Sequence, residues 1–85
     1  MERMKETIIV KLFGPLREKA GRDLITLEIS HPITAGEIIE IVGSKLSLNH
    51  REKSIIRIAS KEGYMEKDQE INENEIYVIP PVGGG

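Results

Sequence analysis

The chain has 85 residues, which is the length of one compact domain and leaves no room for separate cofactor and substrate lobes. Its 12 Lys and Arg against 14 Asp and Glu give a net charge of −2, too little to attract nucleic acid or an anionic membrane. The absence of cysteine excludes disulfides, thiolate metal sites and a side-chain thiol nucleophile. The histidines, His31 and His50, are too few for a histidine metal site, so we expect no bound metal or cofactor. The first ten residues resemble neither a signal peptide nor a membrane span, so we expect a cytoplasmic protein.

The first third of the chain predicts two strands joined by a short helix. Residues 7–13 are β-branched and aromatic and predict a strand, and residues 24–29 predict a second one. Between them, residues 16–20 predict one or two helical turns that end at Gly21 in a left-handed conformation. Because side chains alternate along a strand, one face should carry Ile8, Val10 and Leu12, and the other should carry Ile9, Lys11 and Phe13.

The main helix has the clearest start signal in the sequence. Thr34 followed by Glu37 three residues later forms a capping box, and Ile33 with Ile38 forms a hydrophobic staple around it. Apolar residues then recur at helical spacing and predict the buried stripe of the helix: Ala35, Ile38, Ile39, Val42 and Leu46.

The second half of the chain predicts further strands around that helix. Residues 47–53 are interpreted as a loop, 55–59 as a strand, 64–65 as a short strand and 75–79 as the last strand. One amphipathic helix against a mixed sheet of four or five strands is an α+β arrangement, and it matches the β-grasp plan. We therefore expect a single β-grasp domain over residues 1–80 and an extended, flexible tail over 81–85.

The tail has an unusual composition. The last strand runs directly into Pro80, Pro81, Val82, Gly83, Gly84 and Gly85. The prolines cannot donate ladder hydrogen bonds and favour an extended path, and the glycines add no side-chain bulk. A terminal glycine run is often only a frayed end, and without a following helix it is no phosphate-binding loop. Because the rest of the chain offers little reactive chemistry, the combination instead indicates that the terminal carboxylate is the reactive group.

The sequence resembles the small subunit of molybdopterin synthase, a ubiquitin-like sulfur carrier. Three segments carry the resemblance: VKLFGPLREKAG at 10–21, ITAGEIIEIV at 33–42 and EIYVIPPVGGG at 75–85. The sequence departs from the family's usual pattern at Gly83, where a threonine or another residue often precedes the final glycine pair. The pair itself, Gly84 and Gly85, is kept.

The resemblance implies a mechanism centred on the Gly85 carboxylate. A ubiquitin-activating-type enzyme would use ATP to adenylate it, and a sulfur donor would then convert it to a thiocarboxylate. The tail, with Gly84 giving it a slim tip, would enter the large subunit of the synthase and donate sulfur to the pterin precursor of the molybdenum or tungsten cofactor. In this scheme the protein binds no cofactor and does not catalyse alone, because ATP is consumed by its partner.

A docking surface for such partners follows from strand alternation. Phe13 and Ile79 lie at the ends of the first and last strands, and Tyr77 shares their face, opposite the face that the helix covers. An apolar patch there would flank the root of the tail, and a partner that encloses the tail would contact it together with the tail residues Pro80, Pro81, Val82 and Gly83.

Other functions share the same glycine tip. A sulfur carrier for thiamine synthesis or transfer RNA thiolation, or a ubiquitin-like protein modifier, would also need it. The helical segment between the first two strands, residues 15–20, favours the molybdopterin type, because thiamine carriers usually join these strands by a tight hairpin. An alternative of another class is a β-grasp binding module with an inert tail.

Overall fold

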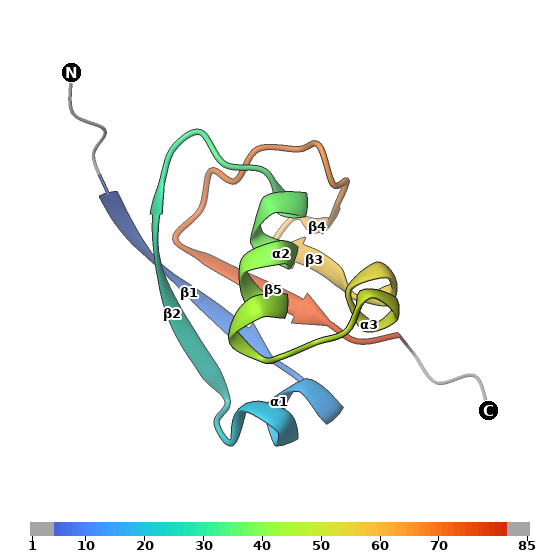
Figure 1. Ribbon diagram of the computed structural model, residues 1–85. Coiled ribbons are helices and arrows are strands. Elements are labelled where there is room, and N and C mark those ends of the chain that lie inside the picture. The colour runs from blue at the N-terminus through green and yellow to red at the C-terminus, as the bar shows by residue number, and fades with distance from the viewer. Residues whose placement is uncertain (1–4, 82–85) are drawn as a thin grey trace.

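The computed structural model describes residues 5–81. Eight elements follow one another along the chain and form one sheet with helices on one side and at one end (Figure 1). Their bounds, in chain order, are β1 Lys5–Leu12, α1 Gly14–Ala20, β2 Leu24–Ser30, α2 Ala35–Lys45, α3 His50–Ile55, β3 Arg57–Ser60, β4 Gly63–Met65 and β5 Glu75–Ile79.

The sheet has five strands in the order β2-β1-β5-β3-β4. The two central strands, β1 and β5, are parallel, and every other neighbouring pair is antiparallel. The helix α2 crosses one face of the sheet (Figure 1), so the predicted α+β class and β-grasp arrangement are confirmed. The last strand of the chain therefore lies in the middle of the sheet, which determines where the tail begins.

Strand alternation builds the core as the sequence predicts. Ile8, Val10 and Leu12 of β1 are buried, whereas Ile9 and Phe13 are exposed on the other side of the strand. The predicted helical stripe from Ala35 to Leu46 is buried as well. Within the described part of the chain, the buried residues are all apolar, so the core needs no buried polar partners.

The start of α2 matches its predicted capping box. The Thr34 hydroxyl accepts a hydrogen bond from the Glu37 amide at 3.2 Å, and the Glu37 carboxylate accepts one from the Thr34 amide at 2.9 Å. Two donors of the first helical turn are thereby satisfied. At the end of α1, Gly21 has φ 73°, the left-handed value that its glycine predicts.

The interpretation of residues 47–53 as a loop is wrong over its second half. Residues His50–Ile55 form α3, and the predicted strand 55–59 begins only at Arg57. The start of α3 is a second capping box, in which the Asn49 side chain accepts from the Glu52 amide at 2.8 Å and the Glu52 carboxylate accepts from the Asn49 amide at 2.8 Å. The capping signal was present in the sequence, but the helix is too short for apolar periodicity to indicate it.

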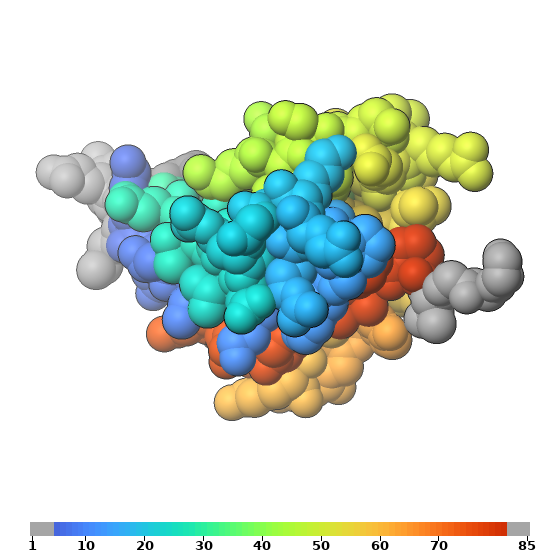
Figure 2. Space-filling model, turned by 90° about the horizontal axis from the view of Figure 1, so that it is seen from below, coloured from blue at the N-terminus to red at the C-terminus, as the bar shows by residue number. Residues whose placement is uncertain are grey.

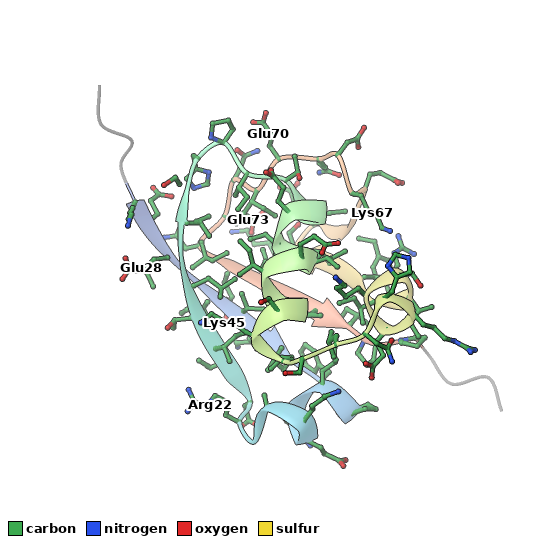
Figure 3. All side chains as sticks on the ribbon, in the orientation of Figure 1. Arg22, Glu28, Lys45, Lys67, Glu70 and Glu73 are labelled. Atoms are coloured by element: carbon green, nitrogen blue, oxygen red, sulfur yellow. The ribbon has the colours of Figure 1, made fainter. Side chains whose placement is uncertain are left out.

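Charges of both signs are spread over the surface of the domain. Figure 3 labels six charged side chains on different parts of the chain: Arg22 after α1, Glu28 on β2, Lys45 at the end of α2, and Lys67, Glu70 and Glu73 between β4 and β5.

Among residues 5–81, no helix has the length and apolar character that crossing a membrane requires.

Candidate functional site at the root of the tail

The C-terminal ends of the two central strands lie at the same end of the sheet, because the strands are parallel. Leu12 pairs with Val78, so the residues that follow these two, Phe13 and Ile79, lie side by side at this end of the sheet. The chain then leaves the sheet through Pro80 and Pro81. Figure 2 views the molecule from this end, with α1 in front, α3 beside it and the end of β5 next to both.

The beginning of α1 holds the root of the tail in place. Gly14 has φ 55°, and a Cβ atom at this position would lie 3.5 Å from Cγ of Pro80. The backbone of Gly14 thus approaches the proline ring, and Pro80 is half-buried while Pro81 is exposed. Two proline rings, one of them packed against α1, give the chain a defined direction as it leaves β5.

Phe13, Tyr77 and Ile79 form what we call the tail-root patch. The rings of Phe13 and Tyr77 lie with their centroids 6.2 Å apart and their planes tilted by 47°, a favourable aromatic arrangement. Phe13 is 40% exposed, and Tyr77 and Ile79 are half-buried. The structure thus brings together the three patch residues predicted from the sequence, on the sheet face opposite α2.

An ion pair lies on the same face beside this patch. Lys11 Nζ is 3.1 Å from a carboxylate oxygen of Glu75, and Lys11 pairs with Tyr77 across the two central strands. The hydrogen bond to Glu75, together with its negative charge, raises the pKa of Lys11 above its ordinary value. The patch is therefore bordered by an ion pair between the two neighbouring strands β1 and β5.

A row of aligned side chains crosses the whole sheet on the face that carries the patch, and sequence patterns did not indicate it. The strand registers align Leu24, Lys11, Tyr77, Ala59 and Tyr64 on five successive strands. The guanidinium of Arg57 lies 4.5 Å from the centre of the Tyr64 ring, a cation–π contact. Alternation indicates which face each residue occupies, but only the long-range register shows which residues are neighbours.

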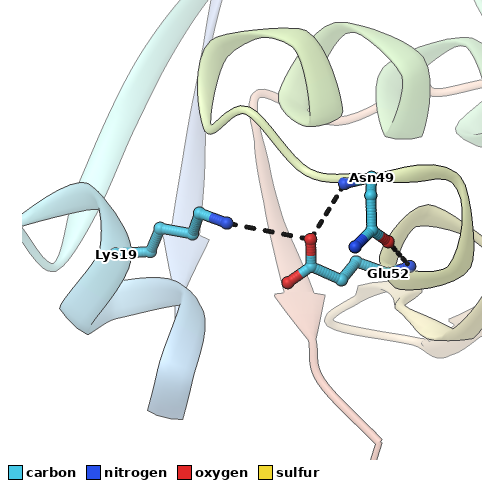
Figure 4. A network of polar contacts seen from close by, with 3 residues as sticks. All are labelled: Lys19, Asn49 and Glu52. Atoms are coloured by element: carbon cyan, nitrogen blue, oxygen red, sulfur yellow. Dashed lines mark hydrogen bonds and ion pairs between the residues drawn. The ribbon is translucent and has the colours of Figure 1, made fainter.

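A second apolar feature adjoins the tail on its helix side, and we call it the tail-root pocket. It has a volume of about 190 Å³ and lies between α1, α3 and the two prolines. Its rim includes Glu52, which joins Asn49 and Lys19 in a small polar network (Figure 4). The sequence did not indicate this pocket, because one of its walls is α3. The lining residues are Pro15, Leu16, Glu52, Ile55, Ile56, Pro80 and Pro81.

The remaining predicted site residues, Val82, Gly83, Gly84 and Gly85, lie outside the described residues, so their roles stay predictions. The two histidines lie apart from the tail root. His31 Nε2 is 2.6 Å from a carboxylate oxygen of Glu6, and His50 begins α3. Within residues 5–81, no three His, Asp or Glu side chains gather as a set of metal ligands.

A mixed five-stranded sheet crossed by one helix, with a central last strand that continues into a tail, defines a ubiquitin-like β-grasp domain. The chain belongs to the ThiS family, whose model matches residues 10–85. This is a family of ubiquitin-like sulfur carriers and modifiers.

Solved structures share the fold across nearly the whole chain. SAMP1 from Haloferax volcanii is 22% identical with a TM-score of 0.74, and the match covers 94% of this chain and 100% of that one. A Pyrococcus furiosus protein assigned provisionally as molybdopterin converting factor, subunit 1, is 24% identical with a TM-score of 0.72 over 89% of this chain and 98% of that one. The UBL domain of Plasmodium falciparum Dsk2 is 14% identical with a TM-score of 0.67 over 91% and 99%. No curated protein sequence matches the chain significantly.

Proposed function

We propose that this protein is a sulfur carrier, the small subunit of a molybdopterin synthase, and that the Gly85 carboxylate is its reactive group. The observation that carries the proposal is the path of the chain. The central strand β5 ends at Ile79 and continues through Pro80 and Pro81 into the sequence Val82-Gly83-Gly84-Gly85. Membership of the ThiS family supports the carrier class, and the likeness to the Pyrococcus furiosus protein supports the molybdopterin assignment.

The chemistry needs activation because a carboxylate is a poor acyl donor. A carboxylate oxygen of Gly85 attacks the α-phosphorus of ATP, and pyrophosphate leaves. A sulfur nucleophile at the oxidation level of sulfide then attacks the acyl carbon, so a carbon–sulfur bond forms while the bond to AMP breaks. The thiocarboxylate sulfur finally attacks a carbon of the pterin precursor and displaces an oxygen leaving group from it. Water then cleaves the acyl–sulfur bond, so the sulfur stays on the precursor and the Gly85 carboxylate is restored. ATP is consumed by the adenylating partner in this scheme.

The tail-root patch serves as the docking surface for the large subunit. A partner that encloses the tail must approach Phe13 and Ile79, because both lie at the end of the sheet where the tail begins. Aromatic and aliphatic side chains at the centre of an interface supply most of its binding energy. The helix α1, which occupies the connection between β1 and β2, agrees with the molybdopterin type rather than the hairpin usual in thiamine carriers.

Mass measurement tests the central step. The protein is incubated with ATP, a ubiquitin-activating-type enzyme and sulfide, and we expect a gain equal to the mass difference between sulfur and oxygen. Tandem fragmentation should locate this gain on Gly85. A gain on any internal residue would falsify the assignment, and omission of ATP is the control that should leave the mass unchanged.

The likeness to SAMP1, the small archaeal modifier protein 1 of Haloferax volcanii, favours protein modification as a second candidate function. A modifier would form an amide bond between the Gly85 acyl group and a lysine amine of a target protein, with AMP or a thiol as the leaving group. The same incubation distinguishes the two functions when cell extract is added. A modifier yields a branched peptide carrying the tail on a lysine, whereas a dedicated carrier yields only the thiocarboxylate.

A further inference from the structure

The tail-root pocket lies on the α3 side of the two prolines, whereas the tail-root patch lies on the open face of the sheet. Residues from α1, the end of α3 and the tail root supply its apolar walls, and its volume of about 190 Å³ suits a single large side chain rather than a helix. Ile55, the last residue of α3, lies at the mouth of this pocket and is 44% exposed, a large exposed fraction for an apolar side chain. An apolar concavity at the surface of a protein is a feature of interaction sites.

The protein's own tail is a poor occupant for this pocket. Val82 is the one apolar residue in the sequence after Pro81, and the glycines that follow have no side chains. The free energy gained by burying one valine is comparable with the entropy cost of fixing it and its neighbours in place. The occupant must therefore be already held in place, as a side chain of a folded partner is.

We propose that the tail-root pocket receives one aliphatic side chain of the adenylating enzyme that activates the tail. This inference rests on the proposed function, because an enzyme that reaches the Gly85 carboxylate must surround the residues that follow Pro81. The surface of the enzyme that surrounds the tail then covers the mouth of the tail-root pocket, because Pro80 and Pro81 line that pocket. The pocket and the patch would thus hold the tail root from two sides and orient the tail toward the ATP site.

Glu52, at the rim of the pocket, offers a hydrogen-bond acceptor beside that aliphatic side chain. Glu52 Oε1 accepts a hydrogen bond from the Asn49 amide at 2.8 Å and lies 3.7 Å from Lys19 Nζ (Figure 4). Its other oxygen, Oε2, takes part in neither contact. A backbone amide or a basic side chain of the partner can therefore donate to Oε2 while the aliphatic side chain enters the pocket.

A pair of variants on α3 tests the pocket. Ile55→Asp places a charge at the mouth of the pocket, and Ser54→Asp adds the same charge one residue earlier, where Ser54 faces a different cavity beside Gly36 and Glu40. Calorimetry with the purified adenylating enzyme should show binding weakened about tenfold or more by Ile55→Asp and little by Ser54→Asp. In pyrophosphate exchange, Ile55→Asp should raise KM for the carrier and leave kcat unchanged, because the tip of the tail is intact.

Controls separate the failure of this inference from the failure of the proposed function. Wild-type protein that supports no pyrophosphate exchange would overturn the proposed function and this inference with it. Wild-type exchange together with equal binding of the two aspartate variants would overturn the pocket alone. Thermal melts accompany both variants, and Ile55→Ser, which removes the apolar wall without adding charge, replaces Ile55→Asp if the latter is unfolded. Normal binding by Ile55→Ser would likewise overturn the pocket.

Discussion

At the scale of single residues, strand alternation predicts the two faces of the sheet. Ile8, Val10 and Leu12 are buried as the period of two requires, and Phe13 is exposed on the opposite face. The contact between Phe13 and Tyr77 depends on the register of β1 against β5, which are separated by most of the chain. Local pattern predicts which face a side chain occupies, and long-range pairing decides what it contacts.

Phe13→Asp should weaken binding to the large subunit without weakening the fold. Phe13 is 40% exposed, so the domain loses little packing, and it is the N-cap of α1 with no side-chain hydrogen bond of its own. Aspartate is a preferred N-cap residue, so it can add a hydrogen bond to α1 in the free protein. At an interface the same carboxylate would be desolvated without a partner, at a cost of roughly 3–5 kcal/mol.

Leu24→Asp is the matched control for this prediction. Leu24 is 39% exposed on the same face but lies on the edge strand β2, away from the tail root. Calorimetry with the large subunit should show a large loss for Phe13→Asp and a small one for Leu24→Asp, and thermal melts of both should resemble the wild type. Equal losses would mean that the patch has no special role, and an unfolded Phe13→Asp would mean that Phe13 serves the core.

At the scale of elements, α2 was predictable and α3 was not. Both begin with a capping box, but α2 carries three turns of apolar periodicity and α3 has six residues with none of them buried. A short helix is formed mainly by tertiary contact. For α3 that contact includes the hydrogen bond from Lys53 Nζ to Glu40 Oε1 at 2.9 Å, which joins it to α2. The tail-root pocket was missed for the same reason.

The contact between α2 and α3 explains a glycine inside α2. Glycine in a helix costs about 1 kcal/mol relative to alanine, yet Gly43 is buried there. A Cβ atom on Gly43 would lie 2.7 Å from Cγ of Lys53, so the alkyl chain of Lys53 occupies the space that a side chain would need. The lysine can reach Glu40 because Gly43 leaves that space open.

A double-mutant cycle on Gly43 and Lys53 measures this coupling. In the Lys53→Ala background, Gly43→Ala should stabilise the protein by roughly 0.5–1 kcal/mol, because only the helix propensity changes. In the wild-type background the gain should be lost, since Lys53 must move and release Glu40. Chemical denaturation of the four proteins gives the coupling free energy. If Gly43→Ala stabilises both backgrounds equally, the lysine does not depend on the glycine.

The ion pair between the two helices also predicts a pH dependence. The hydrogen bond from Lys53, and then its charge and those of His50 and Lys67, lower the pKa of Glu40 below its ordinary value of 4.5. A lowered folded-state pKa stabilises the protein above the unfolded-state pKa, and this contribution is lost as pH falls through the folded-state value. Lys53→Met should therefore be less stable than wild type near neutral pH, and the difference should vanish in acid.

Carboxyl resonances followed by NMR check this prediction directly. The midpoint of the Glu40 titration should lie below the ordinary value in wild type and rise in Lys53→Met. An unchanged Glu40 midpoint would show that the pair does not persist in solution.

At the scale of the whole molecule, the order of strands positions the tail. The last strand in sequence lies between β1 and β3, so its pairing on both sides holds the tail root at the middle of one end of the sheet. Sequence patterns predicted the strands and the main helix, and hence the β-grasp plan, which the observed sheet confirms. They did not predict that apolar surfaces would flank the prolines on two sides, because this depends on α1 and α3 packing around the same end.

Changes at the last residue should separate function from stability more sharply than any other variant. Gly85 lies beyond Ile79, the final paired residue of β5, so deleting it or adding one residue should change the free energy of unfolding by less than about 0.5 kcal/mol. Activity should respond differently in the proposed mechanism. One residue moves the tip by about 3.3 Å, and a displacement of about 1 Å can cost on the order of a hundredfold in rate. An added residue also converts the carboxylate of Gly85 into an amide and removes the group that must be adenylated.

The two variants should therefore melt like the wild type and lose sulfur transfer to the pterin precursor. Pyrophosphate exchange with the adenylating enzyme isolates the first step, and the transfer assay reports the second. Deletion leaves a carboxylate on Gly84 that is one residue too short, so exchange measures how strictly the enzyme senses the length of the tail. Extension makes the carbonyl of Gly85 part of a peptide bond. Cleavage of the added residue should therefore restore the carboxylate and the activity. Full sulfur transfer by the uncleaved extended protein would mean that the Gly85 carboxylate is not the acyl donor, and the proposed mechanism would be overturned.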